Sequence, residues 1–175
     1  MRDLHKGSHT LVVRADNRLD DTTLPKKNVD WFPYGGIDRP VYVEMVPDLW
    51  VERFQIATVE FSADQARLTA SVVVRNAGRP VREKIALAID GQEVRAESRE
   101  IPAGASTLEF EIVVRQPRIW SPEEPNLYSA RVSTGGDDQF TRFGIHSVAV
   151  QDSRILWNGR PVKIRGVNRH EDHPE

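Results

Sequence analysis

The sequence of 175 residues lacks cysteine, which excludes a disulfide framework and a metal site built on thiolates. No run approaches the roughly 18 apolar residues that a membrane helix needs. The opening from Met1 to Val13 is basic but lacks the apolar centre of a secretory signal peptide. We expect a soluble protein whose compartment stays open, because a signal for export, if the native protein has one, is not in this chain.

An excess of charge of one sign is also missing. The 24 Lys and Arg residues nearly balance the 26 Asp and Glu residues, which leaves a formal net charge of -2. No block of like charge is long enough to act as a binding tail. We therefore expect neither a nucleic-acid partner nor a membrane partner.

Helical periodicity is nearly absent as well, and alternation of apolar and polar residues takes its place. This alternation predicts strands over His9–Asn17, Arg39–Val46, Ala66–Gly78, Ser106–Val114 and Leu127–Ser133. Two further segments, Glu83–Ser98 and Arg154–Val167, read as hairpins around Asp90-Gly91 and Asn158-Gly159. To these two pairs we assign turn formation only.

Seven candidate strands lie between Trp50 and about Val148, a number and length typical of one immunoglobulin-like sandwich without its cysteine pair. Pro117, Pro122 and Pro125 predict an ordered loop before the strand at Leu127, and Trp120 in this loop should close one end of the sandwich. Gly135 to Asp138 should turn the chain into a last strand. The predicted core consists of Val72, Val74, Ile85, Leu87, Leu108, Phe110, Ile112, Leu127, Phe143 and Ile145.

Four stretches in register resemble glycoside hydrolase family 2, the β-galactosidase and β-glucuronidase family. They are DWFPYGGIDRPVYVEMVP (Asp30–Pro47), IWSPEEPNLYSARV (Ile119–Val132), RFGIHSVAV (Arg142–Val150) and ILWNGRPVKIRGVNRHEDHP (Ile155–Pro174). The resemblance implies an all-β chain in three parts. A truncated jelly-roll remnant would occupy residues 1–48, the immunoglobulin-like β-sandwich residues 49–149, and the start of a (β/α)8 catalytic barrel residues 150–175.

Polar side chains that could contact a sugar or a metal are concentrated at the end of the chain. Active sites of (β/α)8 barrels lie at the C-terminal ends of the strands. Val162 to Val167 alternates like a strand, and the resemblance makes it the first barrel strand. Asn168, Arg169 and His170 would then contact the sugar. A metal site at His170 and His173 is disfavoured, because their spacing fits no common motif and no third ligand is identifiable. We expect no metal and no cofactor in this chain.

Retaining glycosidases need two carboxylates roughly 5 Å apart. The resemblance places both on later barrel strands, so we expect no catalytic residue here and no activity of the chain alone. Glu171 and Asp172 are rejected as a catalytic pair, because adjacent residues on a strand face opposite ways. The expected parent enzyme hydrolyses terminal β-D-galactosides, and a β-glucuronidase is the alternative. A stand-alone carbohydrate-binding or structural immunoglobulin-like module is the alternative of another class.

Two polar or aromatic groups lie nearer the N-terminus. Trp31, Phe32 and Tyr34 could stack on a sugar, although aromatics beside Gly and Pro more often pack a seam between domains. Arg14, Asp16, Asn17 and Arg18 form a polar strand end that matches no known sugar contact. The expected partner is the carbohydrate substrate of the parent. An open strand edge in residues 1–48 predicts a homo-oligomer, or folding back onto the sandwich.

Overall fold

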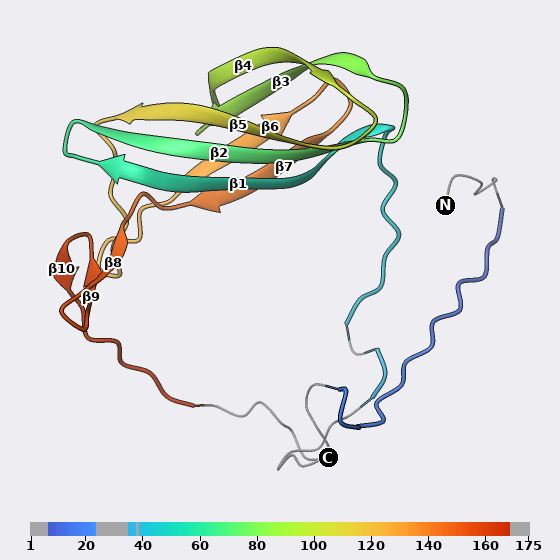
Figure 1. Ribbon diagram of the computed structural model, residues 1–175, viewed down its shortest axis with the longest axis horizontal. Helices are drawn as coiled ribbons and strands as arrows, with labels where there is room; N and C mark the ends of the chain where they lie inside the picture. Colours follow the sequence, from blue (N-terminus) through green and yellow to red (C-terminus); the bar gives the residue numbers. More distant parts are fainter. Residues whose placement is uncertain (1–6, 24–34, 38, 169–175) are drawn as a thin grey trace. The chain divides into compact units, whose positions relative to one another are not determined.

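The computed structural model describes residues 7–23, 35–37 and 39–168. Their regular secondary structure consists of ten β-strands, labelled β1 to β10 in Figure 1. These residues contain no helix, and therefore none suited to crossing a membrane. The chain divides into two compact units, Met1–Glu44 and Met45–Glu175.

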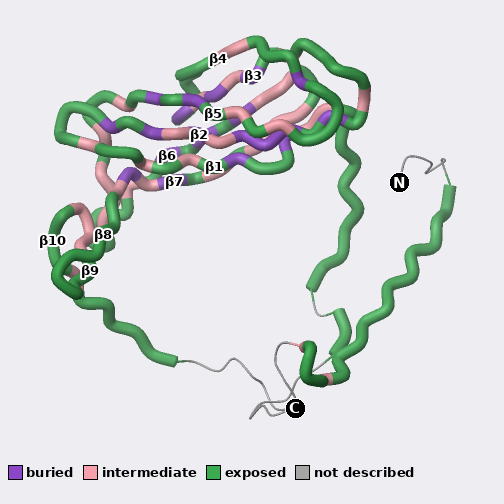
Figure 2. Tube along the Cα trace, viewed as in Figure 1, coloured by how far each residue is buried: buried purple, intermediate pink, exposed green. Residues whose placement is uncertain are grey.

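The described part of the N-terminal unit forms bends, turns and extended segments but no strand. The strands expected over His9–Asn17 and Arg39–Val46 are therefore wrong for this chain. A strand exists through hydrogen bonds to a neighbouring strand, and an alternating sequence does not supply that neighbour. As a result the apolar side chains of both runs stay exposed (Figure 2): Leu11, Val12, Val13, Val41, Val43 and Met45.

The second unit contains an antiparallel sandwich of two sheets. One sheet has the order β1-β2-β5 and consists of β1 (Leu49–Phe61), β2 (Gln65–Asn76) and β5 (Gly104–Arg115). The other has the order β4-β3-β6-β7 and consists of β3 (Val81–Ile89), β4 (Gln92–Ile101), β6 (Tyr128–Ser133) and β7 (Asp138–Phe143). These seven strands confirm the expected immunoglobulin-like sandwich. The fourth strand pairs with the third, whereas in a constant-type immunoglobulin domain it belongs to the other sheet.

The sandwich core holds most of the predicted residues. Buried as expected are Val72, Val74, Ile85, Leu87, Phe110, Ile112, Phe143 and Ile145. Leu108 is partly buried against this core. Leu127 was wrongly placed in it and is 42% exposed, because it precedes β6, whose inward face begins at Tyr128. Since side chains on a strand alternate between its two faces, a strand placed one residue too early puts an exposed side chain on the buried face.

The predicted last strand over Gln139–Val150 is broken in two. β7 ends at Phe143, and β8 (Val148–Gln151) pairs with β9 (Arg154–Trp157) rather than with the sandwich. β9 also pairs with β10 (Arg160–Pro161), so a third sheet with the order β10-β9-β8 follows the sandwich. The expected boundary between residues 149 and 150 falls inside β8. The Asn158-Gly159 turn is confirmed, with φ angles of 51° and 75°.

The segment from Val162 to Val167, expected to be the first barrel strand, has no strand structure. Its one backbone hydrogen bond outside the strands joins the Val162 N–H to the Ile155 carbonyl at 2.9 Å. A barrel strand is hydrogen-bonded to a strand on each side. Beyond this bond from Val162 to β9, no strand of the described residues pairs with the segment, which explains why the expected strand does not form.

Candidate functional site

The residues predicted to contact a sugar are not brought together by the described structure. Asn168 is exposed and lies in an irregular segment. Arg169 and His170 lie outside the described residues, as do the rejected or disfavoured candidates Glu171, Asp172 and His173. The aromatic group Trp31, Phe32 and Tyr34 also lies outside them.

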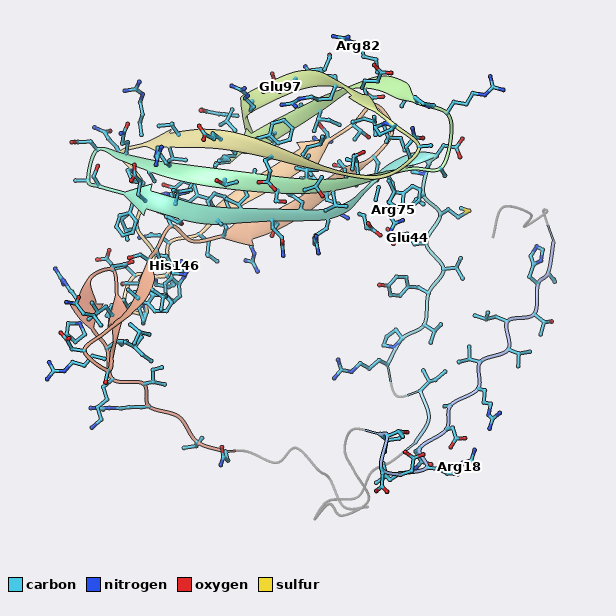
Figure 3. All side chains as sticks on the ribbon, in the orientation of Figure 1. Arg18, Glu44, Arg75, Arg82, Glu97 and His146 are labelled. Carbon is cyan, nitrogen blue, oxygen red and sulfur yellow. The ribbon has the colours of Figure 1, made fainter. Side chains whose placement is uncertain are left out.

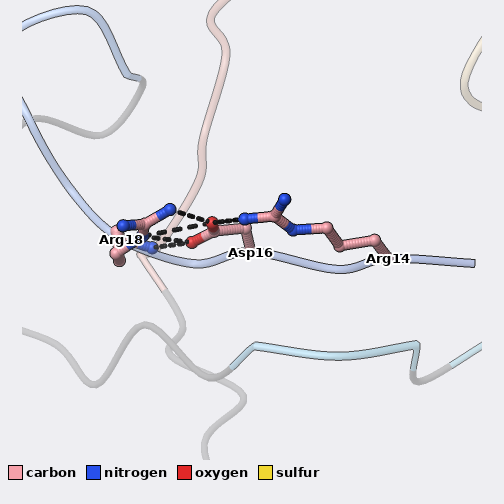
Figure 4. Close-up of polar contacts among 3 residues, drawn as sticks. All are labelled: Arg14, Asp16 and Arg18. Atoms are coloured by element: carbon pink, nitrogen blue, oxygen red, sulfur yellow. Dashed lines mark hydrogen bonds and ion pairs between the residues drawn. The ribbon is translucent and has the colours of Figure 1, made fainter.

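The polar group near the N-terminus forms a local ion cluster (Figure 4). The Asp16 carboxylate accepts hydrogen bonds from the Arg18 guanidinium, the shortest at 2.6 Å, and from the Arg14 guanidinium at 3.2 Å. The Arg18 side chain and backbone N–H lower the pKa of Asp16, and Arg14 adds to this effect. All three residues are exposed, so the cluster is solvated and encloses no site.

Three aromatic rings meet where the chain leaves the sandwich, at the position of His146 in Figure 3. The His146 ring stacks on the Trp157 ring with centroids 4.8 Å apart and planes inclined by 6°. Trp120 lies 5.0 Å from Trp157 and 5.7 Å from His146. A Cβ added to Gly144 would lie 2.6 Å from Trp120 Cγ, so Trp120 covers this glycine closely. Trp120 therefore does more than close the sandwich, because it also contacts β9.

Asn158 ties the same region together through its side chain. Its Oδ1 atom accepts a hydrogen bond from the Ser147 N–H at 2.9 Å, and its Nδ2 atom donates to the Trp120 carbonyl at 2.9 Å. The Asn158 backbone N–H donates to the Ser147 carbonyl at 2.9 Å. We call this region, with Trp120, His146, Trp157 and Asn158, the joint. The expectation that Asn158 serves turn formation alone is therefore wrong.

Asp90 is a second turn residue with a tertiary role that the sequence reasoning missed. Its carboxylate accepts hydrogen bonds from the Ser129 N–H at 2.9 Å and from the Arg118 guanidinium at 2.7 Å. Arg118 lies over the Tyr128 ring, and the Tyr128 hydroxyl accepts the Arg118 backbone N–H at 2.7 Å. A tyrosine at the start of this strand that bonds to upstream backbone is the tyrosine corner of immunoglobulin-like domains. The Leu127-Tyr128 pair after the proline loop could have revealed it.

An open groove of about 620 Å³ adjoins the joint. The proline loop forms one wall, with Ile119, Ser121, Pro122, Glu123 and Glu124, and the β9–β10 hairpin forms the other, with Trp157, Asn158, Arg160, Pro161 and Val162. The polar side chains of Asn158 and Ser121 are occupied by contacts within the chain. The Trp157 Nε1 atom is buried without a hydrogen-bond partner.

The described residues offer little acid–base chemistry. Asn76 is the one polar residue buried among them, so no carboxylate in this part of the chain is enclosed. Glu123 and Glu124 are exposed neighbours on a loop, which is not the rigid facing pair that glycoside hydrolysis requires. No group of three metal-ligating side chains occurs in residues 7–23, 35–37 and 39–168. The contacts that the described structure does show here connect segments distant in the sequence.

Comparison with protein families gives two matches that together cover most of the chain. Residues 49–146 match the family described as glycosyl hydrolases family 2. Residues 148–175 match the TIM barrel domain of glycosyl hydrolases family 2. The change from one match to the next falls at Ser147, inside the joint, so the joint connects segments that match two different models of that family.

Individual relatives agree with these matches. The chain is 29% identical to the "Putative beta-glucuronidase" of Formosa agariphila over 97% of its own length and 22% of the relative's. It is 28% identical to the beta-galactosidase of Staphylococcus xylosus, over 97% of its length and 16% of the relative's. A solved family 2 beta-galacturonidase from Eisenbergiella tayi, bound to galacturonate, superposes with a TM-score of 0.77 at 26% identity, over 91% of this chain and 29% of the solved one. The chain thus spans about a fifth of the length of the curated relatives it matches.

Proposed function

Since the chain belongs to family 2 of the glycosyl hydrolases, we propose that it is a non-catalytic portion of a retaining β-glycosidase whose parent hydrolyses terminal β-D-galactosides. One observation carries the proposal: a complete sandwich continues, through the joint, into a segment that matches the family's barrel. A sandwich that served as a free-standing module would not require that continuation. None of the described carboxylates is buried, which supports a scaffolding role for this portion.

The proposed division of the chain has three parts. Residues 1–48 would belong to the jelly-roll sugar-binding domain, residues 49–149 to the immunoglobulin-like sandwich, and residues 150–175 to the start of the barrel. Asn168, Arg169 and His170 would contact the sugar once the rest of a barrel surrounds them. The partner in this proposal is the carbohydrate substrate.

The sugar specificity has a second candidate. The name of the Formosa agariphila relative favours a β-glucuronidase. The solved beta-galacturonidase adds a third sugar to the range found among the relatives. A uronide carries a carboxylate where a β-galactoside carries a hydroxymethyl group, and recognition of that carboxylate calls for basic side chains in the sugar pocket. The described residues do not form that pocket. The galactoside and uronide hypotheses therefore have to be separated by an activity measurement.

The test compares the purified chain with the protein encoded by the complete reading frame of its gene. Both are incubated with chromogenic β-galactoside, β-glucuronide and β-galacturonide. We expect turnover by the complete protein, fastest on the galactoside, and none by the 175-residue chain. Turnover by the chain that disappears in His170→Ala would overturn the proposal. An inactive complete protein that binds β-glycosides would favour the stand-alone binding module.

A homo-oligomer is a separate proposal about the N-terminal unit. Its exposed apolar runs around Val12 and Val43 have the alternation of strands that lack neighbours. We propose that a second copy of the chain supplies those neighbours. Light scattering during size exclusion should then give the mass of a dimer or a larger species. A monomer at high concentration whose N-terminal segments exchange as freely as a random coil would argue against it.

A further inference from the structure

We propose that Asn158 is a positioning residue, which fixes the orientation of the β8–β9–β10 sheet on the sandwich through the two ends of its side-chain amide. The amide lies between two segments far apart in the sequence. Its Oδ1 atom binds the Ser147 N–H, on the segment that leaves β7, and its Nδ2 atom binds the Trp120 carbonyl, on the proline loop. The hairpin is therefore tied to both segments at one point. The inference does not depend on the sugar that the parent hydrolyses.

A side-chain amide satisfies both contacts at this position. Ser147 presents a donor and Trp120 an acceptor, so the residue between them must accept at one atom and donate at another. Aspartate has no donor when ionised, and glycine has neither group. The backbone adds a second demand, because φ is 51°, a region that asparagine and glycine enter most readily. Asparagine meets both demands.

The Asn158 backbone N–H bond to the Ser147 carbonyl extends the β8–β9 pairing and so lies within the third sheet. The other contacts of the joint hold the sheet near the sandwich but define its angle less strictly. The rings of Trp120, His146 and Trp157 are in contact, and ring contacts tolerate sliding better than directional hydrogen bonds do. The Trp120 N–H bonds to the Ile145 carbonyl at 2.9 Å, a contact that belongs to the sandwich end of the joint. Asn158 thus provides the directional side-chain contacts from the hairpin.

A positioning role differs from a stabilising role because Asn158 lies outside the core. The buried hydrophobic cluster runs from Val51 to Ile145 and includes no residue of β8, β9 or β10. Removal of the Asn158 side chain should therefore release the third sheet while the sandwich stays folded. This separation makes the proposal testable on the intact chain.

The experiment compares Asn158→Gly and Asn158→Asp with Asp152→Gly in the full chain. Asn158→Gly keeps the turn and removes both side-chain contacts, and Asn158→Asp removes the donor alone. The matched control, Asp152→Gly, removes the side chain of another residue with positive φ, in the turn between β8 and β9 (φ 49°). No side-chain hydrogen bond is recorded for Asp152 in the described structure. The readouts are residual dipolar couplings of β8 to β10 against the sandwich, the circular dichroism of the coupled Trp120–Trp157 pair, and amide exchange.

In the wild type we expect one alignment tensor for the sandwich and the third sheet. Asn158→Gly should give the third sheet a separate, weaker tensor, reduce the tryptophan couplet, and speed exchange of the Ser147 N–H by about five- to tenfold. Asn158→Asp should reproduce the tensor change with a smaller effect on Ser147, and Asp152→Gly should match the wild type. Slow exchange at Val72 and Val132 reports that the sandwich is folded. A wild type with two tensors, or an Asn158→Gly variant with one, would overturn the proposal.

Discussion

The Asp137 carboxylate accepts a hydrogen bond from the Val51 backbone N–H at 2.7 Å, although the two residues belong to opposite sides of the sandwich. The Val51 carbonyl accepts a second bond, at 2.7 Å, from the Gln139 side-chain amide. Val51 lies on β1, an edge strand, where the register with β2 shifts between Val51 and Arg53. Side chains from the β6–β7 turn and β7 thus replace the neighbouring strand that this edge lacks. Such capping blocks edge-to-edge pairing at this point.

Asp137→Ala should therefore destabilise the sandwich. Val51 is 2% exposed, and loss of the carboxylate leaves its N–H buried without a partner, which costs about 1 to 3 kcal/mol. The control is the next residue, Asp138, which forms an exposed ion pair with Arg131 at 2.8 Å. Asp138→Ala should change the free energy of unfolding by less than about 1 kcal/mol. Urea denaturation measures both variants, and equal losses would contradict the role given to Asp137.

Tyr128→Phe should also destabilise the protein. The hydroxyl accepts the Arg118 backbone N–H at 2.7 Å, and the ring, 6% exposed, packs on Phe143. The substitution keeps the ring and removes the acceptor, so we expect a loss of about 1 to 2 kcal/mol. Tyr42→Phe is the matched control, because Tyr42 is 82% exposed. Thermal unfolding should show a lower Tm for the first variant alone.

Gly144→Ala tests the close packing under Trp120. The added Cβ would lie 2.6 Å from Trp120 Cγ, which forces the indole to move. Overpacking of this kind typically costs about 1 to 3 kcal/mol. Gly166→Ala serves as the comparison, since a Cβ there has no neighbour within 4 Å. Near-ultraviolet circular dichroism should change for Gly144→Ala and stay the same for Gly166→Ala.

The pH dependence of stability should carry a contribution from Glu97 on β4. The Arg99 side chain, followed by that of Arg95, lowers the pKa of Glu97 from 4.5. Because the pKa is depressed in the folded state, the stabilisation is present above the unfolded pKa and is lost as the pH falls through the folded pKa. The Glu97→Gln variant should therefore lose stability at neutral pH and show a shallower decline below pH 4.5. Identical profiles for the wild type and Glu97→Gln would contradict the assignment.

The sequence predicts the sandwich well because its strands pair with each other within one unit. Val72 and Val74 alternate on β2, and Ile85 and Leu87 alternate on β3 of the other sheet; their burial follows from that pattern. The prediction of strands near the N-terminus was wrong for the opposite reason. The alternation around Val12 and Val43 shows that these segments could pair, but the described structure gives them no neighbouring strand. The sequence also does not show which distant residues come into contact in the folded chain. Asp90 and Asn158 resemble ordinary turn residues until the fold brings Ser129 and Trp120 to them.

The side-chain contacts of the joint should also be lost slowly through a chemical change at Asn158. In an Asn-Gly sequence the following backbone nitrogen can attack the side-chain carbonyl carbon with little steric hindrance and displace ammonia. We therefore expect Asn158 to deamidate with time, and asparagine is among the residues that heat damages. The product carries a carboxylate in place of the Nδ2 donor, or a backbone lengthened by one carbon. Either product loses the contact with the Trp120 carbonyl. An aged sample would then contain two populations, with intact sandwiches in both and a released third sheet in one.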